Sequence, residues 1–128
     1  MKKFILRNAR MTDANDLLAL RKSVIAFFFG EVPTLENHKK WLKKTIADDN
    51  IILLAVMIEG RFAGQVKINE ESGLSEISIS LVKEYRHKGI ATEIILAATE
   101  KTNCSVIALI QKTNAPSLKA FIRAGFGQ

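Results

Sequence analysis

The sequence predicts a mixed α/β fold in which a mostly antiparallel central sheet is flanked by helices. Short runs of apolar or alternating residues in the middle of the chain are typical of strands, and stretches with helical spacing lie before and after them. The 128 residues are enough for one core and too few for two. We therefore expect a single domain over residues 1–128, with elements in the order strand, helix, helix, three strands, helix, strand, helix.

The first part of the chain predicts one strand and one helix. Phe4–Arg7 is a short, mostly apolar opening strand. Thr12 and Asp13 mark a helix start, because both side chains can accept hydrogen bonds from free backbone amides. The apolar residues that follow at helical spacing are Leu17, Leu20, Val24 and Phe28. Residues 30–33 break this helix.

A second helix is expected after Thr34, whose hydroxyl can cap it. Its expected apolar side comprises Leu35, Trp41, Leu42 and Ile46. The densest group of basic residues in the chain also lies on this helix: Lys39, Lys40, Lys43 and Lys44. We interpret these lysines as its solvent-facing side.

A three-stranded meander is expected next. Ile51–Ile58 is entirely apolar, which suits a strand buried on both faces, although a buried helix segment has the same pattern. Turns are expected at Glu59–Gly60 and over 69–73. Between and after them, Phe62, Gly64, Val66 and Ile68 form one alternating set, and Ile77, Ile79 and Leu81 form another, with Glu76, Ser78 and Ser80 on the opposite side.

The last part of the chain predicts a helix, a strand and a helix. Gly89 opens a stretch whose apolar side comprises Ile90, Ile94, Ala97 and Ala98. Val106–Ile110 is a further strand. Asn114 can cap a final helix that Gly125 ends. A meander joined to a strand–helix–strand crossover predicts a mixed sheet with helices on its faces.

Composition excludes several classes of protein. The net charge of +6 favours anionic partners without choosing among nucleic acid, membrane surface and phosphorylated ligand. The single cysteine, Cys104, excludes an internal disulfide and fits a cytoplasmic protein. Neither a signal peptide nor a run of roughly 18 apolar residues is found. Two distant histidines make a metal site improbable.

A candidate anion site lies between the third strand of the meander and the following helix. A polar loop over 83–88 leads to Gly89, and free N–H groups at a helix start bind phosphate where glycine allows close approach. Arg86 and Lys88 add positive charge. A plain strand-to-helix connection has the same pattern. Neither a Walker A loop nor a three-glycine dinucleotide fingerprint is found.

Two motifs resemble those of the GNAT acetyltransferases. Arg86–Ala91 is similar to the Arg/Gln-x-x-Gly-x-Gly/Ala loop of that family. Asn114, Ser117, Phe121 and Gly125–Phe126 resemble its Asn-x-x-Ala/Ser-x-x-x-Tyr-x-x-x-Gly-Phe helix. The resemblance covers essentially the whole chain and implies a GNAT-like sheet.

The resemblance also implies that acetyl-CoA is the cosubstrate. The loop would hold the coenzyme A pyrophosphate through backbone amides of Val82, Arg86, His87, Lys88, Gly89, Ile90 and Ala91. The end of the preceding strand would pair with the pantetheine arm, and Asn114 and Ser117 would contact that arm from the other side. An N–H near Leu81 or Val82 would bind the thioester oxygen.

Acyl transfer to an amine needs a base, and Glu76 is our candidate, either directly or through water. An exposed strand glutamate with no catalytic role has the same pattern. Phe121 departs from the family, which often has a tyrosine there to protonate the leaving thiolate. Because a thiol has a pKa of about 8.5, the thiolate can leave without that help.

The acceptor is indicated less directly. His38 and Trp41 match a His-x-x-Trp on the second helix of acetyltransferases that modify amino groups of nucleotide-linked sugars, which predicts a small-molecule amine acceptor bound at these residues. The alternatives are acetylation of a protein N-terminus or a ribosomal protein, a non-catalytic acyl-CoA-binding module, and a small nucleic-acid binder. The last is disfavoured, because only Trp41 lies near the lysines.

The C-terminal end also differs from the family pattern. The chain stops at Gln128, where relatives continue into further strands, so we expect a domain truncated at its C-terminus. The strand at 106–110 would then present an open apolar edge, which a homodimer could cover.

Overall fold

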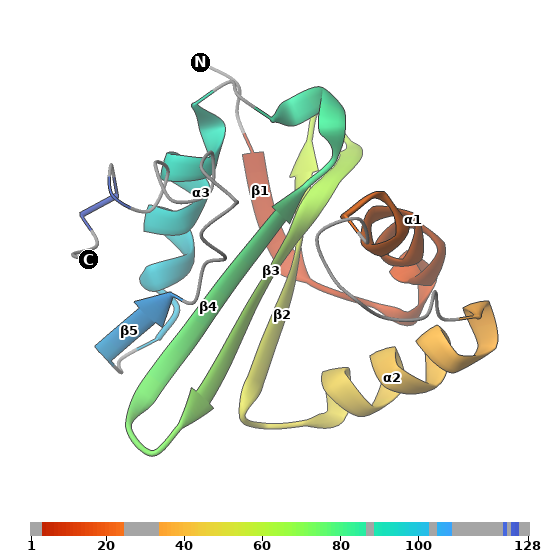
Figure 1. Cartoon of the computed structure of the whole chain (residues 1–128), viewed down its shortest axis with the longest axis horizontal. Coiled ribbons are helices and arrows are strands. Elements are labelled where there is room, and N and C mark those ends of the chain that lie inside the picture. The colour runs from red at the N-terminus through yellow and green to blue at the C-terminus, as the bar shows by residue number, and fades with distance from the viewer. Residues whose placement is uncertain are drawn as a thin grey trace.

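A five-stranded sheet in the order β1-β2-β3-β4-β5 is the centre of the fold (Figure 1). The computed structural model describes residues 4–24, 34–86, 89–102, 105–108, 122, 124 and 125. Strands β1 (Phe4–Asn8), β2 (Ile51–Ile58), β3 (Arg61–Glu71) and β4 (Leu74–Leu81) are antiparallel neighbours, and β5 (Ser105–Ala108) is parallel to β4. The predicted mixed, mostly antiparallel sheet is confirmed.

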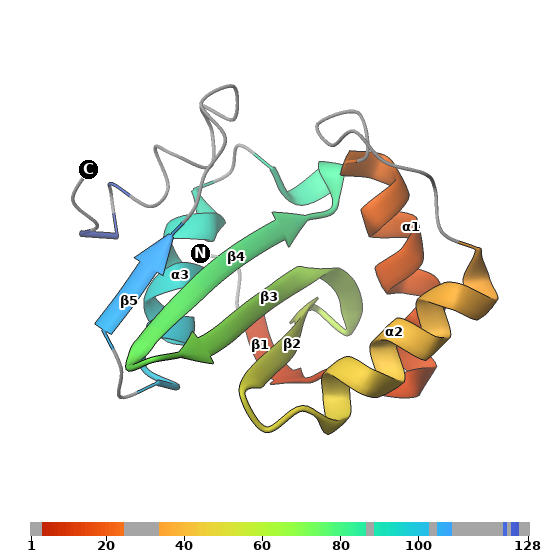
Figure 2. The same cartoon turned by 60° about the horizontal axis from the view of Figure 1, so that its bottom comes forward.

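Helices cover both faces of this sheet, as Figures 1 and 2 show. Helices α1 (Ala14–Val24) and α2 (Leu35–Ala47) lie on one face, and α3 (Ile90–Thr99) lies on the other. Two short 3-10 turns, η1 (Met11–Asp13) and η3 (Lys83–Tyr85), precede α1 and follow β4. None of the described helices is long and apolar enough to cross a membrane.

Strand β2 supplies side chains to two separate cores. Leu53 packs with Leu17 and Leu42 beneath α1 and α2. Its neighbour Leu54 packs on the α3 side of the sheet, with Ile94 among others. Both faces of β2 are therefore buried, which confirms the strand interpretation of this apolar run and excludes the helix alternative.

Two-residue turns join β2, β3 and β4. Glu59 and Gly60 have φ of 52° and 77°, and Ser72 and Gly73 have φ of 53° and 81°, as hairpin turns with left-handed residues require. The first turn is confirmed. The second was predicted too long, because Asn69–Glu71 continue β3 and pair with β4 residues up to Leu74. The polar composition of this stretch resembles a turn, but the pairing of the hairpin extends to its tip.

A β-bulge in β3 changes the side of the sheet that Phe62 occupies. Val56 pairs with Gly64 while Met57 pairs with Phe62, so Ala63 is an extra residue. Phe62 therefore packs with the α1/α2 core rather than with Val66, contrary to the predicted alternation. Gly64 is needed here, because an added Cβ would lie 2.3 Å from the Ser80 carbonyl oxygen.

Helix α2 begins as predicted and buries the middle of its predicted apolar side, where Leu42 is buried and Trp41 packs against the same core. The Thr34 hydroxyl accepts the Asn37 N–H at 3.1 Å, so the predicted cap is confirmed. The predicted apolar residues Leu35 and Ile46 are exposed; both lie within one residue of a helix end, and the helix buries only its middle turns. The buried residues are His38, Leu42 and Thr45, and the four lysines face solvent as predicted.

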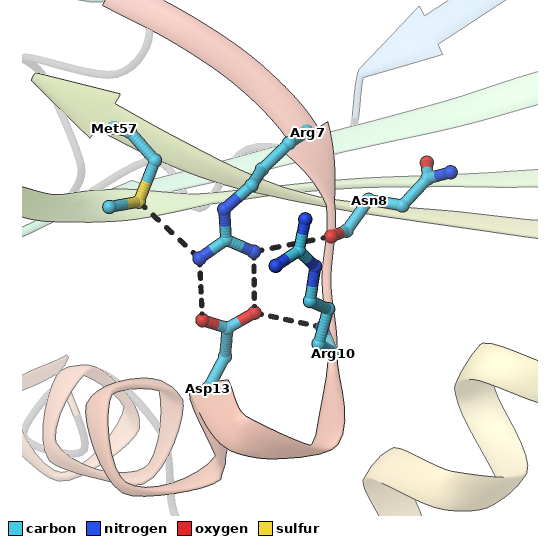
Figure 3. A network of polar contacts seen from close by, with 5 residues as sticks. All are labelled: Arg7, Asn8, Arg10, Asp13 and Met57. Carbon is cyan, nitrogen blue, oxygen red and sulfur yellow. Dashed lines mark hydrogen bonds and ion pairs between the residues drawn. The ribbon is translucent and has the colours of Figure 1, made fainter. Parts of the chain in front are cut away.

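An ion pair fixes the start of α1 against β1 (Figure 3). The Arg7 guanidinium donates to both carboxylate oxygens of Asp13 at 2.8 Å, and the Arg10 backbone N–H donates to the same carboxylate at 2.8 Å. The hydrogen bonds from Arg7 hold the pKa of Asp13 below its ordinary value despite burial. Asp13 thus accepts a free backbone amide at the helix start, as predicted, in a capping box with Arg10, and it also binds Arg7 of β1.

The C-terminal part is described only in places. Strand β5 confirms a strand at Ser105–Ala108, while residues 109–110 of the predicted strand lie outside the described residues. So do Phe28, Cys104 and most of the predicted final helix. Gly125 has φ of 100° and its N–H donates to the Ile122 carbonyl at 3.0 Å, which is the conformation of a glycine that ends a helix.

Candidate functional site

At the C-terminal end of β4, some backbone N–H and C=O groups point away from β3. The Val82 N–H donates to the Ala63 carbonyl at 2.8 Å, so the hydrogen bonds of Val82 point toward β3. Because these directions alternate along an antiparallel strand, the peptide groups of Leu81 and Ile79 point the other way. Described pairing with β5 covers only Leu74–Ile77 of β4. Of the two oxyanion donors predicted, the Val82 N–H is already engaged, and the Leu81 N–H faces the β5 side.

Gly89 forms the junction between this strand end and α3. It is the N-terminal cap of α3 and has φ of 76° and ψ of −5°, a left-handed conformation that favours glycine. A Cβ built on Gly89 would meet no described residue within 4 Å. The first N–H groups of α3, at Ile90 and Ala91, therefore begin beside an open position at the positive end of the helix dipole. His87 and Lys88 lie outside the described residues.

Two residues of the loop before Gly89, Tyr85 and Arg86, pack against the rest of the fold. Tyr85 is buried in the core on the α3 side of the sheet. Arg86 donates from Nε to the Leu81 carbonyl at 2.9 Å and from Nη2 to the Ser23 hydroxyl at 3.4 Å. Its side chain thus holds the end of β4 and touches the last turn of α1, contacts that no motif in the sequence indicated.

Glu76 lies on the face of the sheet that carries α1 and α2. It alternates with the buried residues Ser75 and Ile77 and is exposed, as predicted. Glu76 pairs with Asn69 and precedes Leu81 by five residues, which is roughly 16 Å along a strand. A proton passing from an amine beside Leu81 to this carboxylate would therefore travel through water.

A group of four side chains, which we call the Trp41 cluster, lies on the same face: Arg21, His38, Trp41 and Lys67. The Arg21 guanidinium carbon and the Lys67 ammonium nitrogen each lie 5.8 Å from the centroid of the Trp41 ring. The His38 ring stacks on Trp41 with centroids 5.3 Å apart. Trp41 and Lys67 are half-buried and Arg21 is exposed, so the cluster is open to solvent.

His38 is the buried member of this cluster. It is 1% exposed, and neither ring nitrogen has a hydrogen-bond partner in the described part of the chain. Burial lowers the pKa of His38 below 6.5, and the charge of Arg21 lowers it further. The ring is therefore neutral at pH 7 and has one unused donor and one unused acceptor.

The structure brings the predicted residues together in two places. Leu81, Gly89, Ile90 and Ala91 meet at the β4–α3 junction, whereas His38 and Trp41 lie on the α1/α2 face. Asn114, Ser117 and Phe121 lie outside the described residues. Lys67 was missed, because it lies on the side of β3 opposite to the apolar alternating set and has the sequence pattern of a surface lysine. Over the described ranges, no group of three His, Cys, Asp or Glu side chains is placed to hold a metal.

Comparison with known proteins gives one family. The acetyltransferase (GNAT) domain profile matches residues 3–127. No curated protein sequence matches the chain.

Several solved structures share the fold. The coenzyme A complex of the aminoglycoside acetyltransferase AAC(6')-Ib has a TM-score of 0.81 at 20% identity, covering 98% of this chain and 84% of that one. The spermidine N-acetyltransferase from Vibrio cholerae, with CoA and spermine, has a TM-score of 0.84 at 18% identity, covering 95% and 79%. A GNAT-family acetyltransferase from Streptococcus pneumoniae has a TM-score of 0.71 at 21% identity, covering 96% and 84%.

Proposed function

This chain belongs to the GNAT family of acetyltransferases, and we propose that it moves the acetyl group of acetyl-CoA to a primary amine on a nucleotide-linked sugar. The observation that carries the coenzyme half of this proposal is the β4–α3 junction. There, outward-facing peptide groups of β4 lie before a left-handed glycine and the amino end of a helix. Two solved structures that share this fold hold coenzyme A.

In this proposal the coenzyme lies along the β5 side of the β4 end. The pyrophosphate accepts hydrogen bonds from the amides at Gly89–Ala91, where the helix dipole favours negative charge. The pantetheine arm pairs with the peptide groups of Ile79, because the Leu81 carbonyl already accepts a hydrogen bond from Arg86. Asn114 and Ser117 are proposed as contacts to the same arm.

The reaction needs few protein groups. The lone pair of the neutral amine attacks the thioester carbon, forming the C–N bond and placing negative charge on the carbonyl oxygen. The Leu81 N–H stabilises that oxyanion by donating to it. The oxyanion then collapses and the C–S bond breaks, so that coenzyme A leaves as the thiolate. Glu76 takes the ammonium proton through water. The thiolate can leave without an acid at position 121, because its conjugate thiol has a pKa of about 8.5.

The acceptor half of the proposal is supported by the Trp41 cluster. It lies on the same face of the sheet as Glu76, and Glu76 is a diagonal neighbour of Lys67 through the Lys67–Ser78 pair. An aromatic ring with two adjacent cations suits a sugar attached to a diphosphate. A sugar amine also loses its proton more readily than a lysine, which suits a base that acts through water.

Mass spectrometry of reaction products tests this function. The protein is incubated with acetyl-CoA and a panel of amines that includes nucleotide-linked amino sugars, aminoglycosides, spermidine and N-terminal peptides. We expect a product heavier by one acetyl group from a nucleotide-linked amino sugar, with release of one thiol. Acetylation of peptides alone would favour the protein-modifying alternative, and coenzyme binding without any product would favour a binding module.

A further inference from the structure

The positively charged groups of Arg21 and Lys67 both lie close to Trp41, the single tryptophan of the sequence. Arg21 comes from the last turn of α1 and Lys67 from the middle of β3, and both lie 5.8 Å from the Trp41 ring centroid. The ring attracts each cation, but the two cations repel one another. Across the described residues, neither side chain forms an ion pair.

The acid nearest to this pair along the sheet does not neutralise it. Glu76 is a diagonal cross-strand neighbour of Lys67, and no ion pair joins them. Both cations thus lie against one ring, and no ion pair within the described part of the chain neutralises either of them. This arrangement suits a site whose counter-ion arrives with a ligand.

His38 is a second, independent sign of a ligand at this place. Its ring stacks against Trp41, is almost completely buried, and has both nitrogens unpartnered within the described chain. A buried polar group without a partner is costly, and native proteins retain few of them. A ligand with hydroxyl or phosphate oxygens beside Trp41 can give this ring its missing partner.

We propose that Arg21 and Lys67, each 5.8 Å from the Trp41 ring centroid, form a phosphate subsite in the acceptor region, with His38 stacked against the same ring. The placement of this subsite in the acceptor region rests on the proposed function. Phosphate fits better than carboxylate, because its tetrahedral oxygens can accept hydrogen bonds from two cations that approach from different directions.

This subsite separates the chain from proteins that share its fold. Spermine and kanamycin, which neighbouring structures bind, carry several positive charges. Arg21 and Lys67 repel such ligands. We therefore infer that the acceptor is an amine that carries phosphate, and that polyamines and aminoglycosides are poor substrates.

Tryptophan fluorescence measures this site directly, because Trp41 is the single tryptophan of the chain. The full chain, saturated with coenzyme A so that its own phosphate sites are occupied, is titrated with inorganic pyrophosphate and separately with malonate. We expect saturable quenching by pyrophosphate and at least tenfold weaker binding of malonate. Equal affinities for both anions would overturn the assignment to phosphate.

The variants Arg21→Gln and Lys67→Gln should each weaken pyrophosphate binding about tenfold, because each removes one charged contact. Lys22→Gln is the matched control: it removes the same charge from the neighbouring exposed position of α1. The pyrophosphate affinity of the Lys22→Gln variant should stay within about twofold of the natural protein's, since exposed charges outside a site contribute little. Equal losses in all three variants would show a general charge effect and overturn the subsite.

This test is independent of turnover. Pyrophosphate binding that depends on Arg21 and Lys67 supports the subsite even if no amine in the panel is acetylated, which would count against the proposed function. Conversely, rapid acetylation of spermine without any pyrophosphate binding would overturn the subsite and leave acetyl transfer intact.

Discussion

The two ends of helix α1 hold arginines in opposite circumstances. At the start, Arg7 of β1 donates two hydrogen bonds to Asp13, whose carboxylate is buried. In the last turn, Arg21 lies over Trp41, and the described residues offer it no carboxylate. The first charge has its partner in the fold, whereas the second forms no ion pair with any residue that the structure describes.

This difference suggests how stability and function can be separated in a small protein. Groups whose partners lie within the fold should affect unfolding and leave binding unchanged. Groups whose partners are absent from the fold should affect binding and leave unfolding unchanged. Gly89, with open space where a side chain would lie, belongs to the second kind.

Gly89→Asp should have the largest effect on binding. It places a negative charge at the start of α3, where we expect the coenzyme pyrophosphate, so affinity for acetyl-CoA should fall at least a hundredfold by calorimetry. Gly60→Asp is the matched control, because Gly60 has φ of 77° and equally open surroundings in a distant turn. Both variants carry the same backbone strain. An equal loss of acetyl-CoA affinity in both would therefore show that the coenzyme does not bind at this junction.

Asp13→Asn should have the largest effect on stability. It leaves Arg7 half-buried without its charged partner, at a cost of about 2 kcal/mol in the free energy of unfolding measured with urea. Acetyl-CoA affinity should not change. Asp49→Asn, at an exposed position, should cost less than about 0.5 kcal/mol. A weakened coenzyme affinity in a folded Asp13→Asn protein would contradict the separation.

The same pair gives stability a dependence on acid. Because the pKa of Asp13 is lowered in the folded state, its contribution is present above pH 4 and is lost as pH falls through the folded pKa. Unfolding measured from pH 5 to pH 2.5 should therefore show a steeper loss in the natural protein than in Asp13→Asn. Parallel curves would mean that the Arg7–Asp13 pair contributes little in solution.

His38→Leu should change the free energy of unfolding less than Asp13→Asn does, and in the opposite direction. Leucine fills a similar volume and removes two unpartnered ring nitrogens, so the free protein should be equally stable or about 1 kcal/mol more stable. Because the pKa of His38 is lowered on folding, the natural protein should lose stability below pH 6.5, where the unfolded chain takes up the proton. The variant should lack this loss, and a large destabilisation at pH 7.5 would show that the ring has a partner.

Arg21→Gln should have the smallest effect on unfolding. Its guanidinium is exposed and touches only the Trp41 ring among the contacts described, so the free energy of unfolding should stay within about 0.5 kcal/mol. Arg7→Gln is the contrasting variant and should cost about as much as Asp13→Asn. Equal losses in the free energy of unfolding for the two arginine variants would contradict the proposed difference between Arg7 and Arg21.

Local patterns predicted the fold well where local forces decide it. Apolar alternation found the strands, and the Thr34 cap and Gly89 marked two helix starts. The errors arose where tertiary structure decides: the bulge at Ala63 moved Phe62 to the other core, and pairing extended β3 past its turn-like residues.

The candidate site was predicted unevenly for the same reason. Gly89 belongs to a motif of consecutive residues, and Leu81 follows from the family resemblance that this motif carries. Other contacts join residues of different elements: the Arg7–Asp13 ion pair, the hydrogen bond from Arg86 to the Leu81 carbonyl, and the approach of Lys67 to Trp41. Such contacts depend on packing, which spacing along one element does not encode.

The coenzyme site at the β4–α3 junction is the central claim, and comparing acetyl-CoA with S-acetylpantetheine tests it most directly. The two share the thioester and the pantetheine arm, but only acetyl-CoA carries the pyrophosphate. Calorimetric titration of the natural protein should show acetyl-CoA binding at least tenfold more tightly, because only it can engage the amides at Gly89–Ala91. Equal affinities for the two ligands would contradict this account.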